Sequence, residues 1–394
     1  MNILFLSRDY PPNLIGGVGI YTLEMSRLLA KEGHNVFVIT SAEEFECEYV
    51  DKGVRVFRVK PARFRIFEPL RDKINGFLGR LEYSFAVSRK MREVIKKFHI
   101  DIVESCEARM EGFWYFLLHK KPRLVIKLHT PESIVFKLNN IKRNLDIKLI
   151  NILEDWWIER ADKIVGLTDS IIDLSAKFFN IRKRCISKVP NPIDIDFFKP
   201  LNLNKDTSQR FDNTVLYVGR LEFRKGVHIL IKSIPIVLKE IPDAKFIFVG
   251  SDCGMKPYII SKIKEFNCEN NIIIMDEVSR ESLLEYYMNA SACVIPSLWE
   301  NHPYVCLEAL ACGRPVIASK VAGLAEIIKD NENGILAQPG SFRDLADKII
   351  GLLKNKELQC KLSVNARSFM ETNYNAEKVA RKTINIYEEL IKKK

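Results

Sequence analysis

The chain has 394 residues, of which 47% are hydrophobic and 28% are charged, with only 18 Gly and 16 Pro. About two domains of typical size fit this length, and the composition excludes a disordered, collagen-like or disulfide-stapled protein. No apolar run is long enough to cross a bilayer or to form the core of a secretory signal, so we expect a cytoplasmic protein.

Short apolar segments alternate with helical patterns in the first half of the chain. Residues 2–7 and 36–40 are typical of strands buried on both faces. Between them, apolar residues from Tyr21 to Leu29 recur at helical spacing, and Gly33 ends the helix. Further strands are expected at residues 101–105, 124–129, 163–168 and 186–191. The alternation predicts a parallel sheet covered by helices.

The pattern breaks at residues 197–213, which are polar and rich in turn formers, and then starts again. Strands in the second half are expected at residues 214–220, 245–250, 271–276, 292–297, 315–320 and 334–339, with helices from residue 341 onward. We therefore predict two α/β domains, residues 1–196 and 214–375, joined by a linker at 197–213. Ligands bind at the carboxyl ends of the strands in such sheets, so two facing domains would hold the site in the cleft between them.

The basic excess is concentrated in one stretch. The chain carries 61 basic and 50 acidic residues. Residues 55–97 contain 13 basic residues and four acidic ones. One interpretation is a solvated helix face, because apolar residues between Met91 and Phe98 recur at helical spacing. The other is a surface that contacts anionic lipid headgroups, at the inner face of the membrane, while Phe64, Ile66 and Phe67 enter the interface. No DNA- or RNA-binding signature accompanies the charge, so we expect no nucleic-acid partner.

A glycine-rich loop separates the first strand from the first helix. Gly16, Gly17 and Gly19 allow backbone N–H groups to approach an anion, and the helix N-terminus favours negative charge. A phosphate-bearing ligand fits this loop, and a tight strand-to-helix turn is the alternative. The dinucleotide fingerprint is not met because Thr22 stands where its third glycine would be, and no Walker A motif occurs.

A second motif, VGRLEFRKG, follows the strand predicted at 214–220. Arg220 leaves the strand end, and Lys225 precedes Gly226 and a predicted helix. If the loop folds back, two cations and a helix N-terminus converge on one point, where they would stabilise a developing diphosphate. A solvated basic loop is the alternative.

A third motif lies in residues 297–328. Glu300 precedes Pro303, and Glu308 follows eight residues after Glu300, inside the helix that Pro303 starts. Glutamates accept hydrogen bonds from paired sugar hydroxyls, so one could hold a hexose and the other a ribose. Alternatives are simple stabilisation of a helix dipole and a glycosidase carboxylate pair.

The three motifs, with Asn191-Pro192-Ile193-Asp194 before the linker, resemble the retaining nucleotide-sugar glycosyltransferases of family 4, which have the two-domain GT-B fold. The resemblance implies that residues 1–196 bind the acceptor and 214–375 the donor, and that residues 376–394 form a helix that packs back on the first domain. It also implies transfer of a hexosyl unit from a UDP- or GDP-sugar to a glycan, lipid-linked or other hydroxyl acceptor, without a metal or other cofactor.

The resemblance also assigns roles to single residues. The residues implied to be catalytic are Arg220, Lys225, His129 and Glu300. The residues implied to bind the donor are Gly16, Gly17, Gly19, Asn301, His302, Pro303, Tyr304, Val305, Glu308 and Val278. Among these, Arg220 and Lys225 neutralise the departing diphosphate. Glu300 holds the donor sugar, while Glu308 holds the ribose.

Some residues depart from the family pattern. Asn301 and His302 stand where many relatives have Gly and Phe, which bears on the sugar that is held. The D-x-D triplet that begins at Asp194 matches the metal motif of single-domain transferases, but its place before the linker favours a structural role. Two alternatives to a transferase are a nucleotide-sugar epimerase of the same fold and a non-catalytic, two-lobed sugar-binding protein.

Overall fold

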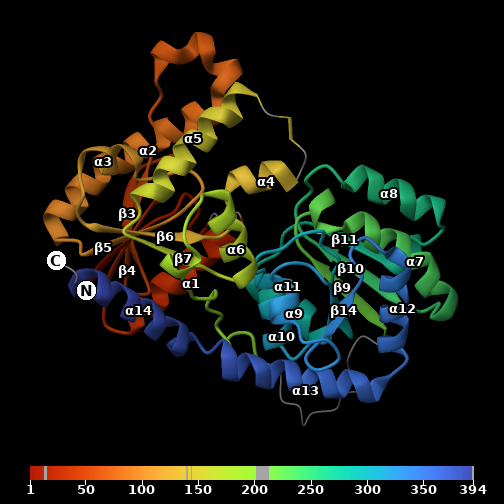
Figure 1. Ribbon diagram of the computed structural model, residues 1–394. Helices are drawn as coiled ribbons and strands as arrows, with labels where there is room; N and C mark the ends of the chain where they lie inside the picture. The colour runs from red at the N-terminus through yellow and green to blue at the C-terminus, as the bar shows by residue number, and fades with distance from the viewer. Residues whose placement is uncertain (13–15, 139–140, 143, 201–212, 393–394) are drawn as a thin grey trace. The chain divides into compact units, whose positions relative to one another are not determined.

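The computed structural model describes residues 1–12, 16–138, 141–142, 144–200 and 213–392 (Figure 1). The chain divides into two compact units, one formed by Met1–Pro192 with Ala376–Lys394 and the other by Ile193–Asn375. Most of the linker expected at 197–213 lies outside the described residues. At its start, Phe198 is fully buried in the second unit, where the Arg367 guanidinium donates to the carbonyl oxygens of Ile195 and Phe198 at 2.9 Å.

The first unit contains an eight-stranded sheet in the order β3-β4-β2-β1-β5-β6-β7-β8. Its strands are β1 (Asn2–Leu6), β2 (Asn35–Ser41), β3 (Cys47–Asp51), β4 (Val54–Val59), β5 (Ile102–Cys106), β6 (Arg123–Leu128), β7 (Lys163–Gly166) and β8 (Ile186–Lys188). All neighbours are parallel except β3 and β4. The six expected strands are confirmed. The β3–β4 hairpin was not predicted, because charged residues interrupt both of its strands.

Helices cover this sheet. They are α1 (Gly17–Lys31), α2 (Arg71–Phe98), α3 (Phe113–Leu118), α4 (Glu132–Leu138), α5 (Leu145–Arg160), α6 (Asp169–Phe178) and α14 (Ala376–Lys392), with 3-10 turns η1 (Arg65–Leu70) and η2 (Lys183–Cys185). The C-terminal helix α14 packs against α1. The hydroxyls of Tyr387 on α14 and Tyr21 on α1 each donate to the buried Glu104 carboxylate at 2.5 Å. Glu104 therefore ties the last helix of the chain to the first.

The second unit contains a six-stranded, all-parallel sheet in the order β11-β10-β9-β12-β13-β14. Its strands are β9 (Thr214–Val218), β10 (Lys245–Val249), β11 (Ile272–Met275), β12 (Ala292–Ile295), β13 (Val316–Ser319) and β14 (Ile335–Ala337). All six coincide with expected segments. Each is a short apolar run between turn residues; the central strands are buried on both faces, while β11 at the sheet edge is partly exposed.

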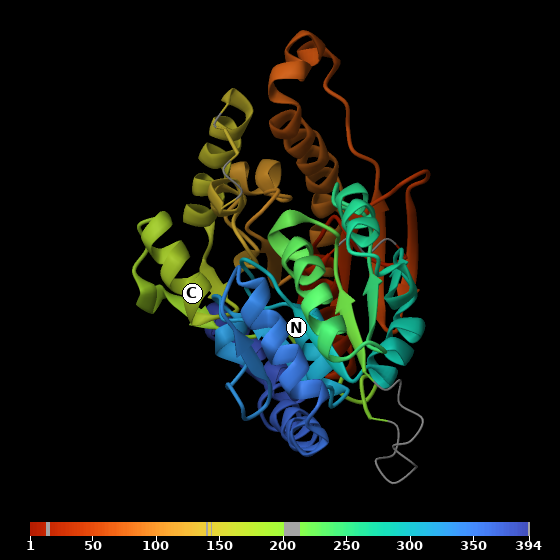
Figure 2. The same ribbon diagram turned by 90° about the vertical axis from the view of Figure 1, so that its right-hand side faces the viewer.

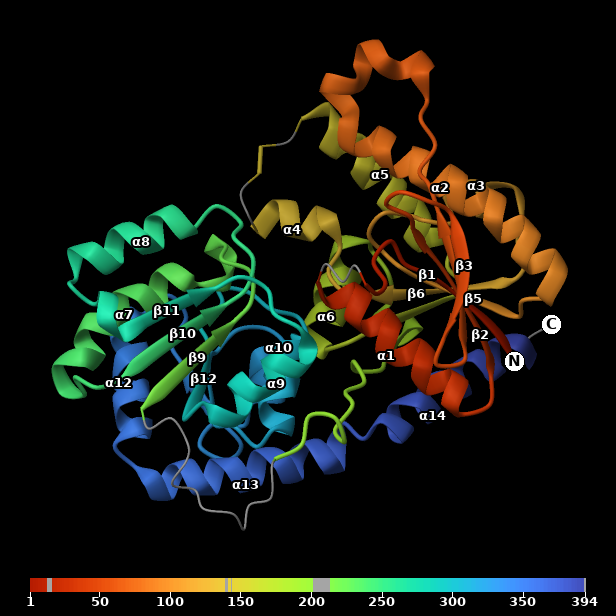
Figure 3. The same ribbon diagram turned by 180° about the vertical axis from the view of Figure 1, so that it is seen from behind.

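The helices of the second unit alternate with its strands, and Figure 3 shows them around the sheet. They are α7 (Val227–Glu240), α8 (Lys256–Glu265), α9 (Arg280–Asn289), α10 (Tyr304–Ala311), α11 (Leu324–Ile327), α12 (Phe342–Leu353) and α13 (Lys356–Asn373), with 3-10 turns η4 (Phe223–Lys225) and η5 (Glu269–Asn271). Apolar side chains of α7 and α12 form the core with those of β9 and β10. The fold is thus α/β with two Rossmann-like domains. None of the described helices is both long and apolar enough to span a bilayer.

Candidate active site

A buried ion pair lies at the carboxyl ends of two neighbouring strands in the second unit. Lys225 ends the turn after β9, and Glu300 lies in the loop after β12, which pairs with β9 in the sheet. The Lys225 ammonium donates to Glu300 Oε1 at 2.5 Å, and the Ser297 hydroxyl donates to the same oxygen at 2.9 Å. The Arg224 guanidinium lies 3.8 Å from Glu300 Oε2. Two cations and a hydroxyl thus surround one carboxylate.

This environment keeps Glu300 ionised. Glu300 is only 5% exposed, and burial alone would raise its pKa. The charges of Lys225 and then of Arg224 outweigh burial and hold the pKa of Glu300 below its usual value. At neutral pH the Glu300 carboxylate accepts hydrogen bonds, and the neighbouring ammonium and guanidinium supply positive charge within reach of the same point.

The close approach of the two loops depends on Gly226. Its φ of +71° lies in the left-handed region, and a Cβ there would meet the carbonyl oxygen of Pro296 at 1.9 Å. A glycine therefore lets the turn that carries Lys225 touch the end of β12. The Leu298 N–H donates to the Arg224 carbonyl at 2.8 Å, which fixes the two loops together.

Arg220 is linked to this pair through two residues that the sequence analysis did not single out. Glu222 accepts from Arg220 at 3.3 Å and from Arg224 at 2.7 Å, and Arg224 also donates to the Trp299 carbonyl at 3.0 Å. Lys225 is thus paired with Glu300 and Arg220 with Glu222. The Arg220 side chain is 45% exposed. Glu222 and Arg224 lie inside the VGRLEFRKG motif, so the alternating charges of that loop could have indicated that these two residues take part in the site.

Most of the second-unit residues that the resemblance implies to bind the donor lie around helix α10. Asn301 and His302 are buried, and the His302 Nε2 lies 3.3 Å from the Tyr374 hydroxyl. Pro303, expected at the first helical position, is instead the N-cap of α10, so the helix begins one residue later, with Tyr304 and Val305. Glu308, one turn further on, is buried and accepts from the Tyr287 hydroxyl at 2.9 Å.

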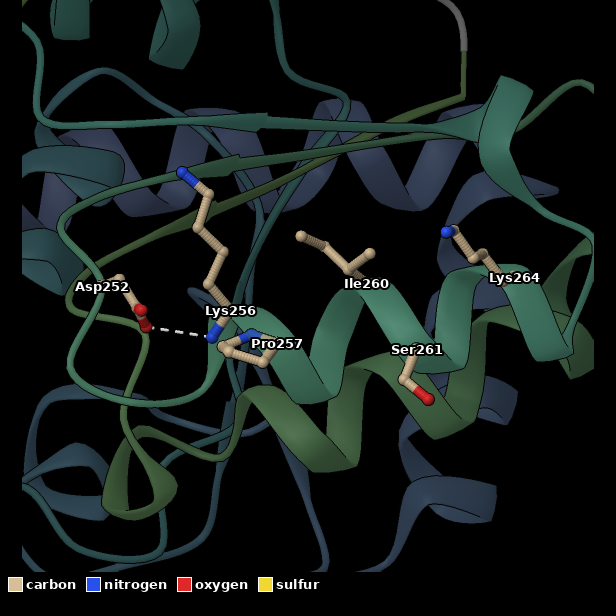
Figure 4. Close-up of a pocket in the computed structure, with 6 residues that line it drawn as sticks. All are labelled: Asp252, Lys256, Pro257, Ile260, Ser261 and Lys264. Atoms are coloured by element: carbon tan, nitrogen blue, oxygen red, sulfur yellow. Dashed lines mark hydrogen bonds between the residues drawn. The ribbon is translucent and has the colours of Figure 1, made fainter.

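Val278, implied by the resemblance to bind the donor, lies in the loop between β11 and α9. Its neighbour Asp276 pairs with Lys256 at 3.2 Å. Lys256 also borders a hollow of about 630 Å³ beside α8 (Figure 4). There, Asp252 accepts the backbone N–H of Lys256 and of two preceding residues at 2.9 Å. No residue predicted for the site lines this hollow.

The predicted residues of the first unit lie at the ends of β1 and β6. Gly16 is the N-cap of α1 with a φ of +97°, Gly17 starts the helix, and Gly19 is buried in its first turn. Residues 13–15 of the glycine loop lie outside the described residues. His129 follows β6, and its ring centroid lies 4.9 Å from that of Tyr21 on α1.

Glu107 holds the loop that carries His129. It is fully buried after β5 and accepts the backbone N–H groups of His129, at 2.9 Å, and of Thr130. Burial raises the pKa of Glu107 to about 8, although these two N–H groups favour its ionised form. Glu111 nearby accepts the Arg8 N–H at 2.7 Å, and burial raises its pKa to about 7. The sequence analysis missed both, although acidic residues just after a strand are a recognisable signal.

The first carboxylate of the D-x-D triplet accepts hydrogen bonds from nearby backbone N–H groups. Asp194 Oδ1 accepts from the N–H groups of Asp196 and Phe197 at 3.1 and 2.9 Å, so it closes a turn. Over the described ranges, no group of three or more His, Cys, Asp or Glu side chains is arranged to hold a metal ion.

Two Rossmann-like domains of this kind make up the GT-B fold of glycosyltransferases. A family model described as glycosyl transferases group 1 matches residues 199–369, and one described as Glycosyltransferase Family 4 matches residues 15–197. Together they span nearly all of the chain between residues 15 and 369. The chain belongs to the group 1 glycosyltransferases.

Named relatives agree with this assignment. The N-acetyl-alpha-D-glucosaminyl L-malate synthase of Bacillus anthracis is 24% identical over 390 residues, covering 96% of this chain and 95% of that protein. Sucrose-phosphate synthase from Thermosynechococcus elongatus has the same fold, with a TM-score of 0.82, 22% identity and full coverage of both chains. The Anabaena protein HepE, solved with UDP and glucose, gives a TM-score of 0.76 and 17% identity, covering 99% of this chain and all of that one.

Proposed function

We propose that this transferase moves a hexosyl unit from a UDP- or GDP-sugar to a hydroxyl group of a glycan or lipid-linked acceptor, with retention of configuration and without a metal ion. The observation that carries the proposal is the buried Lys225–Glu300 pair with Arg224 beside it, because it combines a carboxylate that accepts from sugar hydroxyls with cations for a diphosphate. The structure of HepE solved in complex with UDP and glucose supports a nucleotide-sugar donor.

In this mechanism the second unit binds the donor. The bond between the anomeric carbon and the diphosphate oxygen breaks, and its electron pair stays on the leaving phosphate. Lys225 and Arg220 stabilise that charge, each cation being worth several kcal/mol at about 4 Å in a partly desolvated site. Glu300 accepts from hydroxyls of the donor sugar, and Glu308 accepts from the ribose.

The acceptor hydroxyl attacks the anomeric carbon from the face that the diphosphate leaves, and its proton passes to the leaving phosphate oxygen. The products are the glycoside and the protonated nucleoside diphosphate, so atoms and charges balance without a protein nucleophile. In this proposal the first unit binds the acceptor, and His129, held by Glu107, contacts the donor sugar. Gly16, Gly17 and Gly19 approach the donor diphosphate and the acceptor.

A ligand panel followed by product analysis tests the proposal. UDP, GDP and ADP, and their hexose conjugates, are added to the protein, and the melting temperature is recorded, because a ligand that binds the folded state raises it. We expect one nucleoside diphosphate to raise the melting temperature by several degrees. Transfer to a hydroxyl acceptor should then give a product of unchanged anomeric configuration, with the same rate in EDTA. Consumption of donor without any acceptor, or turnover abolished by EDTA, would contradict the proposal.

The basic stretch of residues 55–97 bears on the acceptor. Several of its cations are engaged within the protein: Arg58 is buried and donates to the Ser41 and Tyr10 carbonyls, and Arg71 pairs with Glu82. The whole stretch therefore cannot act as one lipid-binding surface. A lipid-linked acceptor requires a narrower contact with the membrane.

A further inference from the structure

One end of the first unit exposes a group of large apolar side chains, here named the apolar tip. Its members are Ile66, Phe67 and Leu70 of η1 and Leu145, the first residue of α5. Ile66 is 83% exposed, Leu145 55% and Leu70 48%. Single exposed apolar residues are normal on a protein surface, but a contiguous group of them marks a contact site.

The first half of the apolar tip is held outward by buried contacts. Phe64 packs edge-to-face on Phe85 and Trp114, with ring centroids 5.7 and 6.5 Å apart. The buried Glu82 carboxylate accepts the Phe64 N–H at 2.7 Å and the Arg71 guanidinium at 2.5 Å. These contacts fix both ends of η1, so the apolar side chains between them face water in an anchored turn.

The second half of the apolar tip is joined to the first through Asp146. This residue lies in the first turn of α5 and accepts the N–H groups of Gly76 and Phe77 on α2, at 3.1 and 2.7 Å. Figures 1 and 2 both show η1 and the N-terminal end of α5 at the same end of the first unit, beyond the sheet. Leu145, the neighbour of Asp146, therefore lies at the end of the first unit that carries η1.

Cations border the apolar tip. Arg65, Lys73 and Lys148 are exposed, and none of them forms an ion pair within the described part of the chain. The other exposed cations of α2 lie towards its far end. The helix is kinked at Ile74, and its straight part from Asn75 to Phe98 is roughly 36 Å long. The apolar tip thus has its own positive border, separate from the charge at the end of α2.

We infer that the apolar tip docks on a lipid bilayer with anionic headgroups: its apolar side chains enter the interface and the three cations contact lipid phosphates. Apolar burial and attraction to anionic lipid act together in such binding. A second copy of this chain fits less well, because a two-fold contact would set the same cations against each other. The inference rests on the proposed function only in that the acceptor is lipid-linked.

Co-sedimentation with vesicles tests the inference on the full chain. Vesicles of phosphatidylcholine with phosphatidylglycerol are compared with vesicles of phosphatidylcholine alone. We expect Ile66→Ser with Leu70→Ser to weaken binding to the anionic vesicles at least tenfold, because two interfacial side chains are lost. The matched control is Val364→Ser on α13, which is 58% exposed and should leave binding unchanged.

The charge is tested in the same assay. Arg65→Gln with Lys73→Gln should weaken binding to anionic vesicles several-fold and reduce its dependence on salt. Arg92→Gln with Lys96→Gln, which removes two exposed cations near the far end of α2, should change binding much less. Equal losses in the two double variants would overturn the inference.

Other outcomes also decide the question. The inference is wrong if the unaltered chain does not sediment with anionic vesicles, if it sediments equally with neutral ones, or if Val364→Ser weakens binding as much as the tip variants. It is also wrong if light scattering shows that the unaltered chain is a dimer and the tip variants are monomers, and neither of them binds the vesicles. The melting temperature with nucleoside diphosphate is recorded for every variant. If nucleoside diphosphate raises the melting temperature of none of them, the proposed function is contradicted. The vesicle assay still decides whether the apolar tip contacts the membrane.

Discussion

Replacing Lys225 by Ala isolates the charge that the proposed mechanism needs. The Lys225 and Glu300 side chains are 18% and 7% exposed, and their charged atoms are 2.5 Å apart. Removing one partner of a buried pair typically costs about 3–5 kcal/mol, because the other charge stays buried. Here Arg224 and the Ser297 hydroxyl remain on Glu300, so we expect a loss of about 2–3 kcal/mol in the free energy of unfolding.

The pH dependence of that loss identifies its cause. In the unaltered chain the pKa of Glu300 is held below its usual value of 4.5, so its contribution to stability is present above about pH 4.5 and is lost as the pH falls. Without Lys225, burial dominates and the pKa of Glu300 should rise. The difference in stability between Lys225→Ala and the unaltered chain should therefore shrink as the pH falls, first because Glu300 is protonated in the variant and then, below about pH 4.5, because it also becomes protonated in the unaltered chain.

The same variant should lose far more turnover than donor binding. Losing one preorganised donor to a developing oxyanion lowers kcat by about 10²–10³-fold, whereas we expect the Kd of the intact donor to rise less than tenfold. Release of nucleoside diphosphate with saturating acceptor gives kcat, and a titration of melting temperature gives Kd. Lys232→Ala is the matched control, because Lys232 is an exposed cation on the helix that follows Lys225.

The reasoning fails if Lys225→Ala keeps its kcat, or if Lys232→Ala lowers kcat equally. It also fails if the deficit in stability is the same at pH 4 and pH 7, since the loss would then not come from an unpaired carboxylate.

Three further outcomes are expected. Gly226→Ala should prevent the second unit from folding normally, because a Cβ would lie 1.9 Å from a carbonyl oxygen. The control is Gly254→Ala, also at positive φ but with open space around the Cβ, which should cost only about 1–2 kcal/mol in the free energy of unfolding. Thermal unfolding compares the two variants. Tyr387→Phe should destabilise the first unit by about 1–3 kcal/mol because Glu104 loses a buried donor, and an unchanged urea midpoint would contradict this. Because burial raises the pKa of Glu107 to about 8, the folded state holds a proton that the unfolded chain releases above about pH 4.5. Glu107 should therefore lower stability by roughly 2 kcal/mol from pH 6 to pH 8, in addition to the fall caused by Glu111, whose pKa is raised to about 7. Glu107→Gln should remove the share of Glu107, as urea unfolding at both pH values would show.

The alternation of strands and helices could be predicted from the sequence because the signals are local. Residues 214–218 and 245–249 are short apolar runs between turn formers, and both form strands of the second sheet. The β3–β4 hairpin escaped prediction because charged residues interrupt the apolar run of both strands; β3 lies at the sheet edge, where such residues are tolerated. Local pattern therefore identifies strands with an unbroken apolar run, including the edge strands β11 and β14, and misses strands such as β3 and β4 that charge interrupts.

The sequence by itself determined which residue types were available to the candidate site: cations in the loop after β9, a carboxylate at Glu300, a histidine after β6. Only the tertiary structure decided their partners. Lys225 binds Glu300, 75 positions away, because β9 and β12 are neighbours in the sheet; Arg220 instead shares Glu222 with Arg224. Strand order and burial arise from long-range packing, and burial sets the strength of a charge pair, so neither partner nor strength can be read from spacing along the chain.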